Sequence, residues 1–298
     1  MQKLLRPPRV TAATPKSIMQ NQTLILIQCP DAVGLVASVA QVIARHELNI
    51  ITMREFVDEE NHKFFLRVVC SGVPSSSGLL EQDLLQSLPA NANVSINPAR
   101  QKKIVILVTK EHHCLADLVI RHFFHTLNAD VQAVIGNYDL LKDFTEKFGI
   151  PFHLITHENK DKSSFENELS DKISEYQADY IVLAKFMRIL SPTFVARFEN
   201  KIINIHHSFL PAFIGANPYR QAHKRGVKII GATAHFVTND LDEGPIIVQR
   251  TKSINHSYDV PHMVTAGKEI EKAVLSHAIH LLTEDRVMLQ GNKTIVFE

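Results

Sequence analysis

The sequence predicts an α/β protein of two units: a small β-α-β-β-α-β sandwich followed by a larger, doubly wound domain with a mostly parallel sheet. Segments with helical and strand periodicity alternate along most of the chain, which is typical of βαβ units. The apolar runs of the second part do not alternate with polar residues, as expected for strands buried on both faces. A length of 298 residues is enough for two separate cores.

The first unit is expected over residues 21–97, in the βαββαβ order of a ferredoxin-like fold. Its first strand, 23–28, is mainly aliphatic and stops at Pro30. Gly34 then opens a helix whose apolar residues recur at helical spacing. The remaining elements are strands at 50–57 and 63–70, a helix at 80–88 and a strand at 94–96.

The second unit is expected over residues 104–298, after a short polar linker at 98–103. The expected strands are 104–108, 131–135, 152–155 and 180–184, and the expected helices are 115–127, 139–148 and 165–176. Strand-like runs then end at His206 and cover 229–237, before a long helix at 260–282 and a final hairpin at 287–296. Ligands of such sheets bind beyond the carboxyl ends of the strands.

Composition and charge argue against several kinds of partner. Lys and Arg total 32 and Asp and Glu 31, so the net charge of +1 provides no electrostatic footprint for nucleic acid or an anionic membrane. The longest apolar runs fall far short of the about 20 residues that span a bilayer. Cys29, Cys70 and Cys114 are far apart and odd in number, so no disulfide framework is indicated and a cytoplasmic location is expected. Residues 1–20 are basic, contain three prolines and are expected to form a disordered tail.

A candidate site lies where the run at 202–206 ends. Asn204 and His206 are two residues apart, so on an extended strand their side chains project to the same face. Asp242 follows later, in the polar turn Leu241-Asp-Glu-Gly-Pro245. An amide, an imidazole and a carboxylate can together perform acid/base chemistry on a carbonyl. Taken singly, each residue is better explained as a turn former or a hydrogen-bonded core side chain.

The Asn-x-His strand end and the later Leu-Asp-x-Gly-Pro turn resemble the active-site segments of the formyltetrahydrofolate-dependent transferases and hydrolases. The run Ala184-Lys-Phe-Met-Arg-Ile-Leu190 is similar to the segment that lines the pterin pocket in that family. The resemblance implies catalytic roles for Asn204, His206 and Asp242 and supporting roles for His207 and His235. The folate contacts that it implies are Met187, Arg188, Leu190 and Asp240.

The chemistry of these residues agrees with removal of an N-formyl group. Asn204 can donate an N–H to the oxyanion, which is worth on the order of 10²- to 10³-fold for one such donor. His206 can carry a proton or share in stabilising the oxyanion, and Asp242 can orient the imidazole or deprotonate the water. Which of the two takes the first proton stays open. The arylamine nitrogen of the folate is a good leaving group, so we expect neither a metal nor a cofactor, the folate being the substrate.

The segment Asp31-Ala-Val-Gly-Leu-Val36 resembles the turn before the first helix of ACT domains. Those modules commonly bind an amino acid near this turn and pair their sheets between subunits. The resemblance implies effector contacts from Asp31, Gly34 and Leu35, with glycine or methionine as candidates, and a homo-oligomer joined through the ACT domains. The alternative is that Gly34 only begins a helix and the domain only dimerises. The two units in this order are similar to the bacterial formyltetrahydrofolate deformylase family.

Two features favour water rather than an amine as acceptor. The turn Thr109-Lys-Glu-His-His-Cys114 has no glycine and carries Glu111 where the transferases cradle a phosphate. His207 follows the Asn-x-His motif, where the transferases usually have proline. The resemblance implies hydrolysis of 10-formyltetrahydrofolate to formate and tetrahydrofolate under ACT control, supplying formate for purine synthesis and balancing one-carbon pools. The alternatives are a formyltransferase to an amine acceptor and a catalytically inactive folate or amino-acid sensor.

Overall fold

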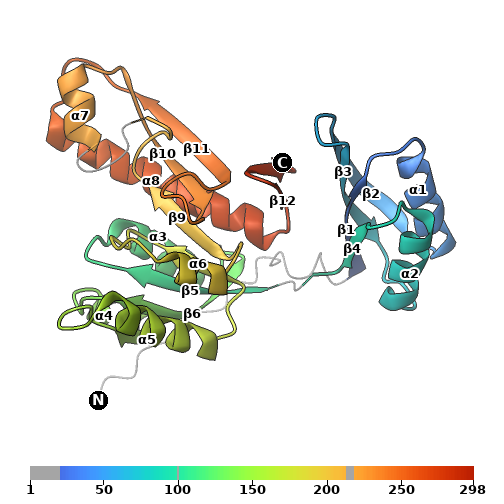
Figure 1. Ribbon diagram of the computed structural model, residues 1–298, viewed down its shortest axis with the longest axis horizontal. Helices are drawn as coiled ribbons and strands as arrows, with labels where there is room; N and C mark the ends of the chain where they lie inside the picture. Colours follow the sequence, from blue (N-terminus) through green and yellow to red (C-terminus); the bar gives the residue numbers. More distant parts are fainter. Residues whose placement is uncertain (1–20, 99–100, 213–217) are drawn as a thin grey trace. The chain divides into compact units, whose positions relative to one another are not determined.

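The structure, a computed structural model, describes residues 21–98, 101–212 and 218–298, and the chain divides after Pro98 into two compact units (Figure 1). The tail expected at 1–20 lies outside the described residues. The linker expected at 98–103 lies partly outside them, and the first strand of the second unit already begins at Lys102. No helix in the described part of the chain has the length and apolar character needed to cross a membrane.

The first unit has the expected βαββαβ order. Its sheet is antiparallel throughout, in the order β2-β3-β1-β4. In β1, alternate residues from Thr23 to Cys29 are buried, and the apolar ones join the apolar stripes of the two helices in one core. The elements are β1 Gln22–Pro30, α1 Leu35–Arg45, β2 Asn49–Asp58, β3 Lys63–Ser71, α2 Ser77–Ser87 and β4 Asn93–Ile96.

The second unit is built on a seven-stranded sheet of order β11-β10-β9-β8-β5-β6-β7. The strands from β9 to β7 pair in parallel, whereas β10 and β11 are antiparallel. The strands are β5 Lys102–Val108, β6 Ala129–Gly136, β7 Phe152–Leu154, β8 Tyr180–Leu183, β9 Ile202–His206, β10 Ile229–Phe236 and β11 Ile246–Ser253, followed by the hairpin β12 Val287–Gln290 and β13 Lys293–Val296. The helices are α3 His113–Phe123, α4 Lys142–Lys147, α5 Lys162–Glu175, α6 Pro192–Arg197, α7 Pro218–Arg225 and α8 Val260–Thr283.

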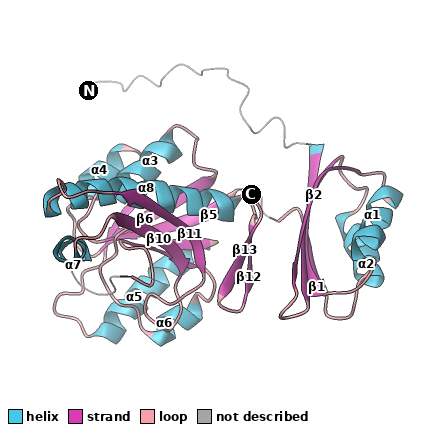
Figure 2. Cartoon of the chain, turned by 90° about the horizontal axis from the view of Figure 1, so that it is seen from above, coloured by secondary structure: helices cyan, strands magenta, loops and turns pink. Residues whose placement is uncertain are grey.

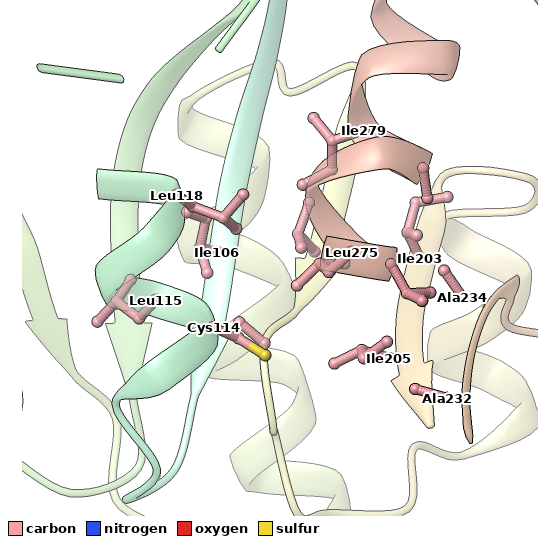
Figure 3. Close-up of a cluster of buried hydrophobic side chains, with 14 of the residues drawn as sticks. Ile106, Cys114, Leu115, Leu118, Ile203, Ile205, Ala232, Ala234, Leu275 and Ile279 are labelled. Atoms are coloured by element: carbon pink, nitrogen blue, oxygen red, sulfur yellow. The ribbon is translucent and has the colours of Figure 1, made fainter. Parts of the chain in front are cut away.

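Helices cover both faces of this sheet, which confirms the predicted doubly wound class (Figure 2). Residues of α3 and α8 pack on one face, where Leu118 and Leu275 meet Ile106 and Ile203 (Figure 3). Residues of α5 and α6 pack on the opposite face. The carboxyl ends of β5, β8 and β9 therefore open at one edge of a sheet that is buried on both sides.

Two elements were not expected from the sequence. Strand β11 is exposed over most of its second half, because it is the edge strand, so it lacks the continuous apolar run of the central strands. Helix α6 has six residues, too few to show a helical period, although Ser191 caps it and Pro192 begins it.

Candidate active site

Strand β9 positions the first two residues of the expected site. It pairs with β8 on one side and β10 on the other. Ile203 and Ile205 belong to the core shared with α3 and α8, so Asn204 and His206 project to the opposite face by alternation. His206 is buried, and Asn204 is partly exposed. The strand therefore places an amide and an imidazole side by side at its carboxyl end, as the spacing predicted.

The turn between β10 and β11 brings Asp242 to His206. Asp242 has a left-handed backbone with φ 59°, which Asp tolerates better than most residues. Gly244 is required two residues later, because a Cβ there would lie 1.9 Å from the carbonyl oxygen of Phe236. The turn folds back so that Asp242 Oδ1 lies 3.2 Å from His206 Nδ1. The imidazole of strand β9 and the carboxylate of the β10–β11 turn thus meet although they are far apart in the sequence.

This contact leaves the other ring nitrogen of His206 for a ligand. Nε2 of His206 is buried and has no hydrogen-bond partner among the described residues. Burial raises the pKa of Asp242, but the hydrogen bond and the charge of His206 outweigh it, so the pKa is lowered overall. Asp242 is therefore ionised at neutral pH and favours a proton on Nδ1 of the ring. Nε2 is then the atom that can accept a proton or, once protonated, donate one.

His235 orients the amide of Asn204. The two residues are cross-strand partners in β9 and β10, and Asn204 Nδ2 lies 3.2 Å from His235 Nε2. His235 Nδ1 lies 2.8 Å from the carbonyl oxygen of Phe236, an acceptor, so Nδ1 carries the proton and Nε2 accepts an N–H of Asn204. Burial lowers the pKa of His235, which keeps the ring neutral. The second amide hydrogen of Asn204 can then donate to a substrate oxygen.

The four residues expected to contact folate lie on two loops. Met187, Arg188 and Leu190 follow β8, and the Met187 N–H donates to Thr109 Oγ1 at 2.9 Å, which ties this loop to the turn after β5. Asp240 is exposed, in the same turn as Asp242. Two apolar residues on these loops, which the motifs in the sequence did not single out, are also highly exposed: the exposed fractions of Ile189 and Leu241 are 65% and 57%.

The three residues expected to bind an effector lie at the start of α1. Asp31 and Gly34 are exposed, and Gly34 has φ 89° at the N-cap position without a side-chain cap. Leu35 has its side chain in the core of the first unit, with 5% exposed. A ligand at this turn would therefore meet the backbone of Leu35 and not its side chain.

A buried charged cluster beside the site was not assigned from the sequence. Glu271 of α8 accepts hydrogen bonds from His113 Nε2 and Tyr219 OH, both at 2.9 Å, and Lys185 Nζ lies 3.2 Å from it. Burial raises the pKa of Glu271, but the His113 hydrogen bond and the Lys185 charge outweigh it and lower the pKa to about 2. We call His113, Lys185, Tyr219 and Glu271 the Glu271 cluster. The signal in the sequence was a charged residue within the apolar stripe of a long helix.

His207 lies between this cluster and the expected catalytic residues. Its ring centroid is 5.1 Å from that of His206 and 6.2 Å from that of Tyr219. Burial, together with the charges of Lys185 and His206, lowers the pKa of His207 to about 4. His207 is thus neutral at physiological pH, because its ring is largely buried and lies near the Lys185 ammonium.

Within the described residues, one group has the donors for a metal ion. The donor atoms of His113, Cys114 and Glu271 lie within 4.8 Å of one another. They fit a metal poorly, since the Lys185 ammonium already lies on the Glu271 carboxylate and burial raises the pKa of the Cys114 thiol. The charge of Glu271 is instead balanced by the Lys185 ammonium.

Comparison with known proteins shows a family match for each of the two units. The Formyl transferase family model matches residues 102–279, and the ACT domain model matches residues 23–77. A formyltetrahydrofolate deformylase of Haemophilus influenzae is 50% identical over 278 residues, covering 93% of this chain and 100% of the relative. The chain belongs to the formyltetrahydrofolate deformylase family. A deformylase of Bacillus subtilis is 41% identical, covering 93% of this chain and 94% of its own.

Solved structures agree with this family. The crystal structure of a formyltetrahydrofolate deformylase from Pseudomonas syringae pv. tomato aligns with a TM-score of 0.87 at 36% identity, covering 93% of this chain and 95% of that one. Glycinamide ribonucleotide transformylase 1 from Symbiobacterium toebii aligns with a TM-score of 0.64 at 26% identity, covering 67% of this chain and 96% of that one. The fold is thus shared with transferases, whereas the match along nearly the whole chain is with deformylases.

Proposed function

We propose that this protein hydrolyses 10-formyltetrahydrofolate to formate and tetrahydrofolate. Relatives that carry the deformylase name match it over nearly its whole length. The observation that carries the proposal is the buried Nε2 of His206, which has no hydrogen-bond partner among the described residues, beside the Asn204 amide and with Asp242 on the other ring nitrogen. This is an acid/base group aimed at a position where a formyl carbon can sit.

In the proposed reaction, Nε2 of His206 takes a proton from water as the water oxygen bonds to the formyl carbon. The negative charge moves to the formyl oxygen, which accepts a hydrogen bond from the free amide N–H of Asn204. Asp242 stabilises the imidazolium through Nδ1. The bond between carbon and N10 then breaks, N10 receives the proton from His206, and the formic acid released ionises to formate. This order makes His206 the first proton acceptor.

Substrate contacts are proposed on the loops after β8 and β10. The exposed apolar side chains of Met187, Ile189 and Leu241 offer surface for a flat pterin ring. Arg188 is exposed on the same loop and can pair with a carboxylate of the folate, and Asp240 can accept from the amino groups of the pterin. No cofactor or metal is required in this scheme.

Regulation is proposed through the first unit. The ACT match covers the turn that holds Asp31 and Gly34, and the open N-terminus of α1 suits the carboxylate of an amino acid such as glycine or methionine. We expect these units to join subunits into a homo-oligomer. The three buried cysteines are free thiols, which suits a reducing cytoplasm, and the formate would supply purine synthesis and balance one-carbon pools.

Formate release decides the proposal. Purified protein is given 10-formyltetrahydrofolate in an amine-free buffer, and formate and tetrahydrofolate are quantified against time. We expect both products in equal amounts. Consumption of the substrate only after an amine acceptor is added would show a transferase, and binding without turnover would show a sensor.

A further inference from the structure

The Glu271 cluster joins four separate elements at the edge of the sheet where the site lies. Lys185 follows β8, His113 begins α3 directly after the turn that follows β5, Tyr219 is in α7 and Glu271 is in α8. The exposed fractions of Lys185, His113 and Glu271 are 8%, 6% and 1%. The reaction proposed above uses none of these charges, although they lie at the carboxyl ends of the central strands, where ligands of such sheets bind.

The chain tolerates unfavourable local structure to keep this lysine in place. Lys185 has φ 64°, a left-handed conformation that favours glycine. Glu271 already accepts hydrogen bonds from His113 and Tyr219, so it does not depend on the ammonium for a partner. Strain of this kind persists where the surrounding structure enforces it, and it gathers at functional sites.

The packing around the carboxylate is equally specific. Gly267, one turn before Glu271 on α8, leaves room for Tyr219, because a Cβ at that position would lie 1.9 Å from the tyrosine oxygen. On the outer side, Glu111 contacts His113 Nδ1 at 3.6 Å and accepts a hydrogen bond from Lys268 at 2.7 Å. Lys185 and Glu271 therefore pair within the cluster, and Glu111 and Lys268 pair beside it.

The cluster borders the reacting groups through His207, whose ring is 5.1 Å from that of His206 and 6.2 Å from that of Tyr219. The proposed folate loops carry exposed residues, whereas the cluster is buried. The side chains of the cluster thus occupy buried space next to His207, at the carboxyl ends of β5 and β8, and a second substrate that approached the formyl carbon from this side would meet them.

Resting on the proposed hydrolase activity, we propose that the Glu271 cluster, with Lys185 as its key residue, determines acceptor specificity by filling the amine-acceptor side of the site with internally paired charge. Water is small enough to pass this cluster and reach the formyl carbon. A second substrate that carries an amine is too large to do so. Glycinamide ribonucleotide transformylase shares the fold and, by its name, acts on such a substrate, so the fold itself does not exclude an amine.

The reaction that the cluster prevents is formyl transfer. The lone pair of an amine nitrogen would form the bond to the formyl carbon, the bond from that carbon to N10 would break, and the proton lost by the amine would pass to N10. The products would be an N-formylamine and tetrahydrofolate, with no oxidant or reductant needed.

Lys185→Gly tests the proposal, because glycine suits φ 64° and removes the side chain without straining the backbone. Lys185→Met removes the charge but keeps most of the volume, and Lys272→Gln, at a surface ion pair of the same helix, is the matched control. Each full-length variant is incubated with 10-formyltetrahydrofolate and glycinamide, and formate and N-formylglycinamide are quantified by mass spectrometry. Thermal unfolding checks that each variant is folded.

We expect wild type and Lys272→Gln to give formate alone. Lys185→Gly should divert at least a tenth of the formyl groups to glycinamide, rising with glycinamide concentration, and Lys185→Met should divert fewer. A folded Lys185→Gly that yields formate alone overturns the specificity role. A folded Lys185→Gly with neither product overturns it too, since Lys185 would then serve the water reaction itself. Failure of the wild type to release formate without glycinamide would instead refute the proposed function.

Discussion

Replacing Asp242 with Asn keeps the shape of the side chain and removes its charge, so it isolates what the carboxylate does for His206. Asp242 Oδ1 lies 3.2 Å from His206 Nδ1, and 13% of the Asp242 side chain is exposed. A hydrogen bond to a charged group in such a setting is worth about 1.5–3 kcal/mol. At about 1.4 kcal/mol per tenfold in rate, kcat should fall by about 10- to 150-fold. KM should change by less than about threefold, because the contact is made within the protein and not to the substrate.

The assay is initial-rate formate release, with thermal unfolding to verify the fold. Glu243→Gln is the matched control, since Glu243 is an exposed acid in the same turn and no role is assigned to its side chain. A folded Asp242→Asn with kcat within about threefold of wild type would refute the reasoning, because the imidazolium would then not need the carboxylate. A fall of the same size in Glu243→Gln would attribute the loss to the turn as a whole.

Three further predictions concern other contacts. Asn204→Ala should lower kcat by about 10²- to 10³-fold, because it removes an oxyanion donor. His235→Phe should lower kcat by less, since it only leaves the Asn204 amide free to rotate. Equal kcat in Asn204→Ala and wild type would contradict this. Gly244→Ala should lower the melting temperature and formate release together, because its Cβ would lie 1.9 Å from the Phe236 oxygen, and an unchanged melting temperature would be inconsistent with that contact. The pKa of Glu271 is lowered from 4.5 to about 2, so its ionised form stabilises the fold above about pH 4.5 and this contribution is lost as the pH falls toward 2. Wild type should lose up to about 3 kcal/mol of unfolding free energy over that range relative to Glu271→Gln, and parallel pH profiles in urea unfolding would argue against it.

Local patterns in the sequence were sufficient to predict the fold class. Continuous apolar runs indicated strands buried on both faces, and their alternation with helices indicated a doubly wound sheet. The limits of long elements such as α8 were close to those observed, because burial along a helix repeats every few residues. The edge strand β11 and the short helix α6 escaped detection, since exposure or brevity removes that period.

The candidate site was likewise predictable from the sequence only in part. Spacing alone put Asn204 and His206 on one face of a strand, because side chains alternate along extended backbone. Their partners come from elsewhere in the chain: the register of β9 with β10 sets His235 against Asn204, and the β10–β11 turn carries Asp242 to His206.

The fold class and the residues of the strand end could be predicted from the amino-acid order, since both follow from periodicities within one element. Contacts between charges that are distant in the sequence became visible only in the folded protein. Lys185 and Glu271 are 3.2 Å apart although a loop after β8 and the middle of α8 carry them. No periodic pattern in the sequence indicates such a pair, because its energy depends on partners and burial that exist only after the elements have packed.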